Sequence, residues 1–585
     1  MSNRRNATSG TLGSRRTAEQ QAQHREIMPI FVGLLLVLFV AMMSNTIVGT
    51  TLPVIIGDLG GTQMQYTWIA TAMLLASTIS APIIGKLADL LDKKKLLMWA
   101  IVVFTAGSLL SGAVADTGQL IAARVVQGLG MGGLMSMVQI VIASIIPPRE
   151  RGRYSGYMGA AMAVATVSGP LIGGLIVDVP WLGWRWTFWI GVPFALAAMA
   201  VLHRLLRIPP APRRAVHIDY WGATLITLSV TSLLLWLSFA GTQFPWGSWQ
   251  TAVMVGGGVL AALAFVLVEV RVREPLVPMW LLAQRTTALA VVSSFAVGIA
   301  MMSMPIFLGQ YFQLGRGYSP TESGLMLAPM MLGVFVASTV AGRLVSARGT
   351  WKRYVVGGMI LLTGGAALMV TTDADTPVWL VGTFMLLFGL GQGASMQNIV
   401  LAVQNTVGLA NMGAATSVVT FFRTLGGAIG VQVLGAVFAN HVSGLIARRA
   451  VDAGLTNGVD DVSTSSVDFD VLPAALEEIV RGAYADGMSV VFLGQAVFAL
   501  VGTLAVLGMR GSTLRDTVDL AKQEEVRTVL EEGASEQEAL TVATEVAQRD
   551  AAERAQEAGE AADRPAPGEP EVGGDGDNAR EHART

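Results

Sequence analysis

The sequence predicts an all-helical protein that crosses a membrane many times, with both termini on the cytoplasmic side. Of its 585 residues, 52% are hydrophobic and only 14% are charged, whereas about a quarter of the residues in a soluble domain are charged. Apolar stretches of about 20 residues recur along the chain, and each is long enough to cross a bilayer as a helix. Basic and acidic loops alternate between these stretches, which is the charge pattern of a polytopic membrane protein.

About fourteen such stretches are recognisable from hydropathy. They cover residues 28–56, 64–88, 96–115, 119–146, 154–178, 184–206, 219–240, 250–270, 287–312, 323–346, 353–371, 376–402, 413–440 and 487–509. The first is too long for a signal peptide, and no small-residue cleavage site follows it. An even number of spans returns the chain to the side on which it begins.

Loop charge sets the expected orientation, because basic residues in short loops stay in the cytoplasm. The loops expected inside carry Lys93–Lys95, Arg149, Arg151, Arg153, Arg204, Arg207, Arg213, Arg214, Arg271, Arg273, Arg285, Arg343, Arg348, Lys352 and Arg353. The loops expected outside carry Asp58, Asp116, Asp178, Asp373 and Asp375. The exceptions are Arg185, Arg316 and three residues of the long last outer loop, Arg448, Arg449 and Arg481.

An internal repeat at an offset of roughly 260 residues indicates a duplicated bundle. The echoed pairs are Gly85–Asp92 with Gly342–Gly349, Gly128–Gly132 with Gly389–Gly393, and Gly169–Gly174 with Gly426–Gly430. We therefore expect six-helix bundles at 27–207 and 286–510, with two inserted transmembrane helices at 215–272. The remaining parts are a basic cytoplasmic tail at 1–26, expected to be disordered, an extracellular loop at 441–486, and an acidic, mostly disordered cytoplasmic tail at 511–585.

A tight charged turn follows the second apolar stretch. It reads Gly85-Lys86-Leu87-Ala88-Asp89 and continues to the basic cluster Lys93–Lys95. This pattern resembles the signature between the second and third spans of major facilitator superfamily transporters, although Leu90 stands where Arg is usual and Asp92 where a second Gly is usual. The resemblance implies an inner gate, in which Asp89 accepts hydrogen bonds from a neighbouring helix terminus or pairs with a cytoplasmic arginine. The plain alternative is a turn whose lysines only fix the orientation. The implied gate residues are Gly85, Asp89, Lys93, Lys94, Gly342, Arg343 and Arg348.

The fourth stretch carries Arg124 and Gln127 in a segment that resembles the family's second motif. An arginine inside an apolar span is costly unless it is paired or reaches water, so Arg124 is either a functional group or a side chain that extends to the outer surface. The glycines at 128–133 have the spacing of a dinucleotide-binding loop. No strand precedes them and they lie within an apolar run, so we expect them to pack helices closely.

In the fifth stretch, Gly169-Pro170-Leu171-Ile172-Gly173-Gly174 resembles the motif that family usage associates with exporters. Pro170 removes a helix hydrogen bond, and the glycines allow a neighbouring backbone to approach. We expect Gly169, Gly173 and Gly174 to form a pivot against the other half of the chain. Ordinary packing of small residues would account for the same glycines.

Further segments resemble the fourteen-span drug:proton antiporters of this superfamily. They are Asn45–Pro53, Trp184–Phe188, Asp219–Ala223, Gly317–Pro320 and Phe421–Gly427. In the first segment the family often has an acid where this chain has Ser44. The resemblance covers residues 28–510 and implies a cell-membrane exporter of lipophilic drugs or antibiotics that works in exchange for protons.

A proton-driven exporter needs a carboxylate tuned by burial, yet no Asp or Glu lies in the middle of an expected span. Asp58, just beyond the first span, is the leading candidate for protonation from outside, and a surface acid at a helix end is an equal alternative. Arg124 and Gln127 are further coupling candidates. The cavity candidates by analogy are Asn45, Thr50, Gln139, Gln310, Gln313, Gln397 and Asn398. Scattered amides among Met, Phe and Leu suit a promiscuous pocket, and they suit helix packing equally.

Other classes of protein fit the sequence less well. The phosphate-binding Gly-x-x-x-x-Gly-Lys-Ser/Thr motif of an ATP-driven pump is absent from the sequence, and the lack of cysteine excludes disulfides and thiolate metal sites. No set of acids and histidines indicates an enzyme, a metal or a cofactor. An exporter or flippase of a lipid, siderophore or other endogenous metabolite is the alternative, since one fold can move such cargo. We expect a small lipophilic substrate, protons and the bilayer as partners, no nucleic acid, and a monomer.

Overall fold

The structure is a computed structural model that describes residues 3–179, 181–208, 219–241, 243–272, 274–408, 411–453 and 474–514. Side chains are described from residue 27 onward, apart from a few positions within the helices. The chain divides into two compact units, Met1–Val518 and Asp519–Thr585, and every described residue belongs to the first. The predicted acidic tail therefore lies outside the described residues beyond Leu514.

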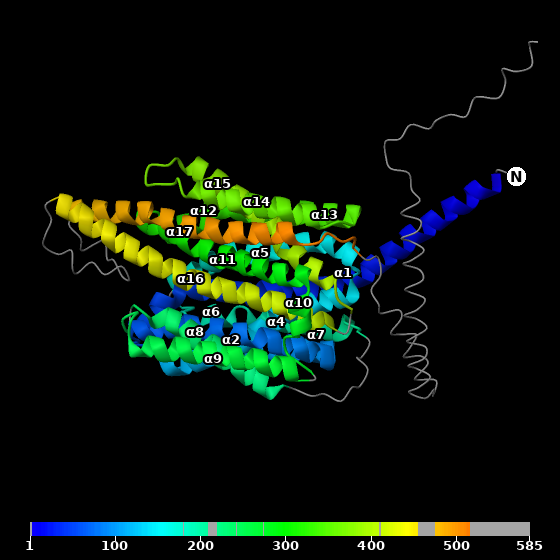
Figure 1. The fold of residues 1–585 in the computed structure, drawn as a ribbon, viewed down its shortest axis with the longest axis horizontal. Coiled ribbons are helices and arrows are strands. Elements are labelled where there is room, and N and C mark those ends of the chain that lie inside the picture. Colours follow the sequence, from blue (N-terminus) through cyan, green and yellow to red (C-terminus); the bar gives the residue numbers. More distant parts are fainter. Residues whose placement is uncertain are drawn as a thin grey trace, which may run out of the picture. The chain divides into compact units, whose positions relative to one another are not determined.

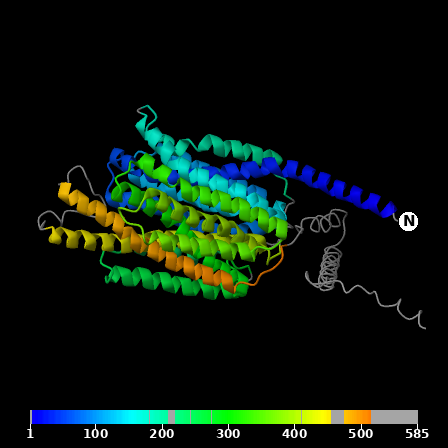
Figure 2. The same ribbon diagram turned by 90° about the horizontal axis from the view of Figure 1, so that it is seen from above.

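The predicted all-helical membrane fold is confirmed (Figures 1 and 2). The first half of the chain forms α1 (Asn3–Asp58), α2 (Gln63–Leu90), α3 (Lys93–Ala113), α4 (Thr117–Ile145), α5 (Pro148–Asp178), α6 (Trp186–Trp189) and α7 (Val192–Leu205). The inserted helices are α8 (Tyr220–Phe239) and α9 (Trp249–Arg271). The second half forms α10 (Met279–Ala283), α11 (Arg285–Gln310), the π-helix η1 (Tyr311–Gly315), α12 (Pro320–Met326), α13 (Ala328–Arg348), α14 (Lys352–Met369), α15 (Val378–Gln404), α16 (Met412–Asp452) and α17 (Ala474–Gly508).

Thirteen helical stretches among the described residues are long and apolar enough to cross a membrane. Helix α14, with 18 residues, occupies the place of the predicted span 353–371 and packs against α15 and α17. The predicted number of spans therefore agrees with the helices. One difference lies at the start of the chain, because α1 begins at Asn3, inside the segment expected to be disordered.

Helix boundaries follow local capping chemistry. Thr62 and Gln65 form a reciprocal capping box at the start of α2, which satisfies two of the N–H groups that a helix start leaves unpaired. Asp92 accepts a hydrogen bond from the N–H of Lys95 at 3.1 Å and begins α3. The usual family glycine is therefore replaced here by a residue that caps the next helix.

Proline divides the predicted span 184–206 into two helices. Helix α6 ends at Trp189, and α7 begins at Val192 with Pro193 in its first turn. Proline has no N–H to donate to the preceding turn, so it fits a helix start better than a helix interior. The sequence pattern predicted one continuous span because hydropathy does not register this break.

The predicted outer loop at 441–486 is wrong at both ends. Helix α16 continues to Asp452, and α17 begins at Ala474, while residues 454–473 lie outside the described residues. The two extensions pack on each other, since a Cβ on Gly487 would lie 2.6 Å from the side chain of Val442. Arg449 also pairs with Asp486 at 2.5 Å. Charged residues lower the hydropathy of these two segments, so the hydropathy pattern did not reveal that both are helical.

Arg316, an exception to the predicted charge pattern, has a structural role. Its guanidinium donates to the hydroxyl of Tyr311 at 2.8 Å and to the carbonyl of Asp373 at 3.2 Å, and it also donates to the carbonyl of Thr376. It thereby joins η1 to the connection between α14 and α15. An arginine that satisfies otherwise unpaired carbonyls fits this end of the bundle despite its charge.

Equivalent glycines pack equivalent helices in the two halves. A Cβ on Gly130 of α4 would lie 2.3 Å from the backbone nitrogen of Phe104, and one on Gly391 of α15 would lie 2.2 Å from that of Leu362. The other glycines of both segments make matching contacts with α2 and α13. The repeat in the sequence is therefore a repeat in packing, and the glycines at 128–133 serve helix contact as predicted.

The two halves meet mainly through two helix pairs, α2 with α16 and α5 with α13. The inserted helices pack on each other, and α8 also contacts both α2 and α16. In Figure 1, α13, α14 and α15 lie along the upper edge of the bundle, and α8 and α9 lie along the lower edge. The inserted pair therefore lies over a seam between the halves.

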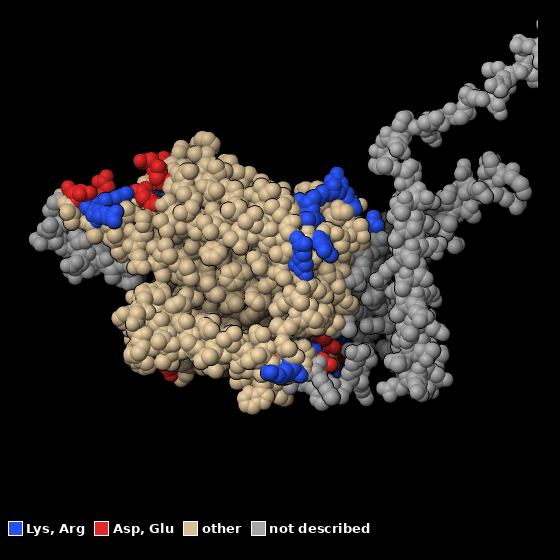
Figure 3. Space-filling model, in the orientation of Figure 1, with Lys and Arg blue, Asp and Glu red and all other residues tan. Residues whose placement is uncertain are grey.

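The ends of the bundle differ in charge. On the face shown in Figure 3, Lys and Arg gather toward one end, most Asp and Glu lie toward the other, and a broad band between them shows neither colour. We call the end that carries Lys93–Lys95, Arg149 and Arg348 the basic end. We call the end that carries Asp58 and Asp373 the acidic end.

Replacing a contact glycine should destabilise the bundle. Gly391→Ala would drive a methyl group into the backbone of Leu362, whereas nothing lies within 4 Å of a Cβ on Gly364 in α14. Alanine favours a helix over glycine by about 1 kcal/mol, so Gly364→Ala should keep or raise the melting temperature. Gly391→Ala should lower the unfolding free energy by about 1–3 kcal/mol. Equal thermal melting of the two purified variants in detergent would contradict this packing.

Candidate functional site

The end of α2 lies against the first turn of α16, and backbone makes the contact. A Cβ on Gly85 would lie 2.0 Å from the Cβ of Ser417 and 3.0 Å from the carbonyl oxygen of Gly413. A Cβ on Gly413 would lie 2.3 Å from the carbonyl oxygen of Gly85. Larger side chains do not fit at these separations, so glycine is required on both helices. Because α2 and α16 belong to different halves, this contact joins the halves at the basic end.

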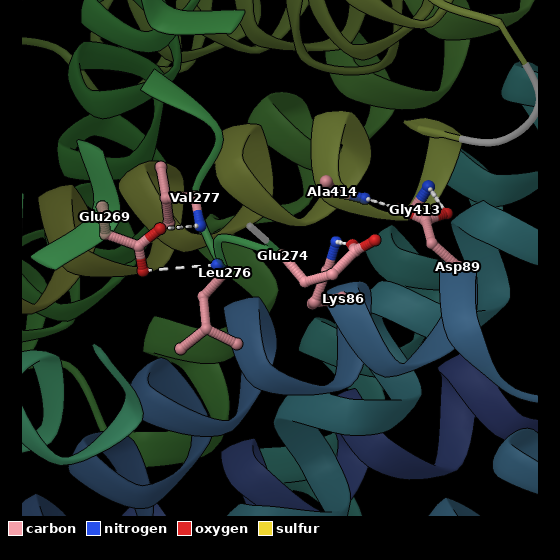
Figure 4. Close-up of polar contacts among 8 residues, drawn as sticks. All are labelled: Lys86, Asp89, Glu269, Glu274, Leu276, Val277, Gly413 and Ala414. Carbon is pink, nitrogen blue, oxygen red and sulfur yellow. Dashed lines mark hydrogen bonds and ion pairs between the residues drawn. The ribbon is translucent and has the colours of Figure 1, made fainter. Parts of the chain in front are cut away.

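The carboxylate of Asp89 caps the start of α16 (Figure 4). Its Oδ1 accepts a hydrogen bond from the N–H of Gly413 at 2.7 Å, and its Oδ2 accepts one from the N–H of Ala414 at 2.7 Å. A helix start leaves these N–H groups unpaired and carries positive dipole charge, so an anion is favoured there. We expected Asp89 to accept hydrogen bonds from a helix terminus or to pair with a cytoplasmic arginine. In the structure it binds the helix terminus.

An equivalent contact joins α5 to α13. A Cβ on Gly342 would lie 1.9 Å from the carbonyl oxygen of Gly152, and one on Gly152 would lie 2.3 Å from the carbonyl oxygen of Gly342. Ser346 stands where the first half has Asp89, and its carbonyl accepts a hydrogen bond from Nε of Arg149 at 3.3 Å. The two contacts are alike in backbone geometry, but only the first has a carboxylate cap.

The basic residues predicted for the gate lie around these contacts. Arg343 and Arg348 are exposed. Lys94 donates a hydrogen bond to the carbonyl of His203 at 2.7 Å, and Lys93 is partly buried at the first position of α3. The structure brings Gly85 and Asp89 together with α16 and places the predicted basic residues at its margin.

Lys86 is a site residue that the sequence analysis did not select. It is buried, and its Nζ lies 2.5 Å from Oε2 of Glu274 in the connection between α9 and α10. Lys86 precedes Asp89 by three residues, so both side chains lie on one face of α2. Its position in the charged turn could have marked Lys86 as a candidate. Its partner could not be predicted, because Glu274 is 188 residues away in the sequence.

Arg151 is a second residue whose role was missed. It is buried and donates from Nε to the carbonyl of Ile146 at 2.7 Å, from NH1 to Oε1 of Gln404 at 3.0 Å, and from NH2 to the carbonyl of Ala143. It therefore joins the end of α4 in the first half to the end of α15 in the second. Sequence analysis used this arginine only as a marker of orientation.

Three predicted cavity residues gather near Arg151. Gln139, Gln397 and Asn398 line a cavity of about 30 Å³ with Arg151 and others. That volume holds one or two water molecules, whereas drug-sized ligands occupy about 300–1,000 Å³. This cavity is therefore too small for a drug-sized ligand in the arrangement described here.

The remaining cavity candidates lie apart from this group. Asn45 is exposed on α1, and the side chain of Thr50 lies outside the described residues. Gln310 and Gln313 lie at the end of α11 and in η1, where Nε2 of Gln313 is 3.5 Å from the hydroxyl of Ser323. Oε1 of Gln310 is buried with no hydrogen-bond partner among the described residues. The structure does not join these four residues to the cavity at the basic end.

Arg124 lies inside the bundle and does not extend to the surface. Only 2% of it is exposed, and its NH1 donates to Oε1 of Gln127 at 2.7 Å. Gln127 in turn donates to the hydroxyl of Ser108 at 2.8 Å, and Nε of Arg124 lies 3.4 Å from the carbonyl of Ile69. The guanidinium is held by neutral acceptors from α2 and α4. The alternative in which the side chain extends to the outer surface is therefore excluded.

The exporter-like motif packs within the first half, not against the other half as we expected. A Cβ on Gly169 would lie 2.0 Å from Oγ1 of Thr46 in α1, and that hydroxyl donates to the carbonyl of Ala165 at 3.2 Å. Gly173 is buried, and nothing lies within 4 Å of a Cβ on Gly174. The side chain of Pro170 lies outside the described residues.

The reason for this difference is helical phase. The glycines of α5 that face α13 are Gly152, Gly156 and Gly159. Gly169 follows ten residues after the last of them, which turns it by about 80° to a neighbouring face of the helix. The contact with the other half therefore lies nearer the start of α5.

Asp58 lies at the acidic end, about half exposed. Its Oδ2 accepts a hydrogen bond from Nε1 of Trp184 at 2.7 Å and lies 3.7 Å from NH1 of Arg185. The guanidinium of Arg185 also lies over the ring of Trp184, 4.4 Å from its centre. Asp58 thus ties the end of α1 to the start of α6 and accounts for Arg185, another exception to the predicted charge pattern.

Comparisons with known proteins agree with this arrangement. The family model of the Major Facilitator Superfamily matches residues 34–431. Two solved structures, the human organic anion transporter MFSD10 and the proton:xylose symporter XylE, each share the fold with a TM-score of 0.54 at 14% sequence identity. The first comparison covers 82% of this chain and 99% of the other, and the second covers 83% and 95%.

Curated relatives are similar over most of the chain. An MFS-type transporter of Mycobacterium tuberculosis is 36% identical over 84% of this chain and 70% of its own length. The multidrug transporter protein MdtP of Bacillus subtilis is 36% identical over 72% of this chain and 77% of its own length. The efflux pump FUS6 of Gibberella fujikuroi is 32% identical over 84% of this chain and 90% of its own length. The chain is a multi-pass membrane transporter that belongs to the major facilitator superfamily.

Proposed function

We propose that this transporter is a secondary active exporter that moves lipophilic drugs or antibiotics out of the cell in exchange for protons. The observation that carries the proposal is the pair of equivalent glycine contacts that closes the basic end between the two halves. Alternating access requires a closure that seals one side and separates again. Contacts made mainly by backbone meet that requirement, because only a few side-chain hydrogen bonds, such as the Asp89 cap and the Arg151–Gln404 bond, have to be broken.

The direction of export rests on the orientation of the bundle. Basic loops favour the cytoplasmic side, and the basic end carries Lys93–Lys95 and Arg348. With that end facing the cytoplasm, the arrangement described here is closed to the cell interior. Substrate would enter from the cytoplasm after the glycine contacts part and leave at the acidic end after they re-form.

The class of substrate is supported by relatives and by residue type. Several curated relatives are named as a multidrug transporter or as efflux pumps. The cavity candidates Gln139, Gln397 and Asn398 are neutral amides among apolar side chains, and such a surface binds lipophilic compounds with little selectivity. Export of an endogenous lipid or metabolite is the other outcome that the experiment below distinguishes.

Arg124 is proposed as a residue that couples helix movement to transport. Only 2% of Arg124 is exposed, and a charged side chain buried inside a membrane bundle is energetically costly. Its contacts with Gln127 and with the carbonyl of Ile69 join α4 to α2, and α2 carries the Asp89 cap. A shift of α2 therefore changes the surroundings of the buried charge.

Transport driven by a pH gradient tests the proposed function. Inside-out vesicles containing the full chain should accumulate a fluorescent lipophilic cation such as ethidium when their interior is acidified. Accumulation should collapse when an uncoupler is added, because the proton gradient is the energy source. Vesicles without the protein are the control.

Two results would contradict this proposal. Accumulation that persists without a proton gradient would remove proton exchange from the account. Labelled lipid that changes leaflets in the same vesicles, with no uptake of lipophilic dyes, would favour the lipid exporter instead.

The role of Asp89 as a gate is tested by Asp89→Asn. A hydrogen bond to a charged group contributes about 1.5–3 kcal/mol, so losing the charge should weaken the closed state about tenfold or more. Uptake in the vesicles should fall at least about tenfold, with protein abundance unchanged.

Asp92→Asn is the matched control for this variant. Asp92 is an acid of the same turn but caps α3 through the N–H of Lys95, and asparagine is an equally good cap. Its uptake should stay near that of the unchanged protein. Equal uptake by both variants would count against a gate role for Asp89.

A further inference from the structure

The inserted helices rest on both sides of the seam between the halves. Ile226 and Val230 of α8 and Phe265 of α9 form one apolar cluster with Ile79 of α2 and Val418 of α16. Helices α2 and α16 belong to different halves and must move relative to each other when the basic end opens. The inserted pair therefore cannot keep both of its contacts unchanged during that movement.

Two carboxylates face each other at the basic end of this pair. Asp219 precedes α8 and Glu269 lies in the last turn of α9, with only 6% and 2% of each residue exposed. Oδ2 of Asp219 and Oε1 of Glu269 lie 2.3 Å and 2.8 Å from one point, the place of a Cβ on Gly222. The two oxygens are thus separated by no more than about 5 Å.

The hydrogen bonds of the two acids differ. Glu269 accepts from the N–H of Leu276 at 3.3 Å and from the N–H of Val277 at 3.1 Å, one bond on each oxygen (Figure 4). Asp219 accepts from the N–H of Gly222 at 2.8 Å, but only on Oδ1. Its Oδ2 is buried, directed toward Glu269, and without a hydrogen-bond partner among the described residues.

Among the described residues, the charged groups around the pair do not neutralise both acids. Lys86 of α2 forms an ion pair with Glu274 at 2.5 Å, in the same connecting segment whose backbone Glu269 holds (Figure 4). Arg271, two residues after Glu269, is exposed. Neither α10 nor residues 412–422 of α16 contain an ionisable side chain. Two buried carboxylates at this separation disfavour double ionisation.

We propose that Asp219 and Glu269 together hold one proton while the basic end is closed. The proton gives the unpartnered oxygen a hydrogen-bonding role and removes the repulsion between two anions. This inference deepens the proposed proton exchange, on which it rests, by placing a proton site in the inserted helices.

The site is connected to the gate through the segment after α9. Glu269 holds Leu276 and Val277 of this segment, and Glu274 in the same segment holds Lys86, one helical turn from Asp89 (Figure 4). When α2 and α16 part, α8 loses one of its two contacts and the acid pair gains access to water. Ionisation then becomes favourable, so the proton is released at the basic end as the gate opens.

Infrared spectroscopy of the purified full-length protein tests the site without any transport assay. At neutral pH the unchanged protein should show the carbonyl band of a protonated carboxylic acid, with the small downshift in D₂O that identifies an exchangeable proton. Asp219→Asn should remove that band, because the remaining acid no longer faces a second anion that disfavours its ionisation. Glu269→Gln should remove it for the same reason.

Glu150→Gln is the control, since it removes an exposed acid at the start of α5 and leaves both the acid pair and the Lys86–Glu274 ion pair in place, and it should keep the band. Thermal melting shows which variants are folded. The proposal is overturned if the unchanged protein lacks the band at neutral pH, and this result needs no variant. It is also overturned if the band survives in both Asp219→Asn and Glu269→Gln. Failure of pH-driven dye uptake with the band pattern intact would instead reject the proposed exchange and retain the proton site.

Discussion

The glycine contacts at the basic end constrain the rest of the structure. Gly85 with Gly413, and Gly152 with Gly342, bring backbones of different halves so close that no Cβ fits. Without water to drive helices together in a bilayer, such close packing of small residues is a principal source of helix association. These contacts fix where α2 meets α16 and α5 meets α13. The cavity that Gln139, Arg151 and Gln397 line near these contacts has a volume of about 30 Å³.

The two contacts are not equal, and the difference has a mechanical consequence. The α2–α16 contact carries the Asp89 cap, the Lys86–Glu274 ion pair and the inserted helices, whereas the α5–α13 contact has Ser346 where the first has Asp89. A capping carboxylate is therefore present at one of the two backbone contacts related by the repeat, and arginines such as Arg149 lie at the other. We infer that chemical control of opening acts mainly at α2–α16, while α5–α13 follows as its geometric counterpart.

Much of this architecture could be predicted because it depends on local pattern. Hydropathy and loop charge located the helices. The repeat of the Gly85 segment at Gly342 located the second contact between the halves. Asp89 was selected because its motif is local. The partners of Arg151 and Glu274 could not be predicted, because they lie 253 and 188 residues away in the sequence. The continuation of α16 to Asp452 was missed because charged residues such as Arg449 lower hydropathy without interrupting a helix.

The most direct test of the account measures both contacts at once. The chain has no cysteine, so spin labels can be attached to introduced cysteine pairs at Leu91 and Gly408, across α2–α16, and at Glu150 and Ala347, across α5–α13. Electron–electron distance measurements should show a short and a long population for each pair. The account predicts that the two long populations rise together when substrate or pH is changed. Movement of one pair alone, or a single short distance for both pairs under every condition, would contradict it.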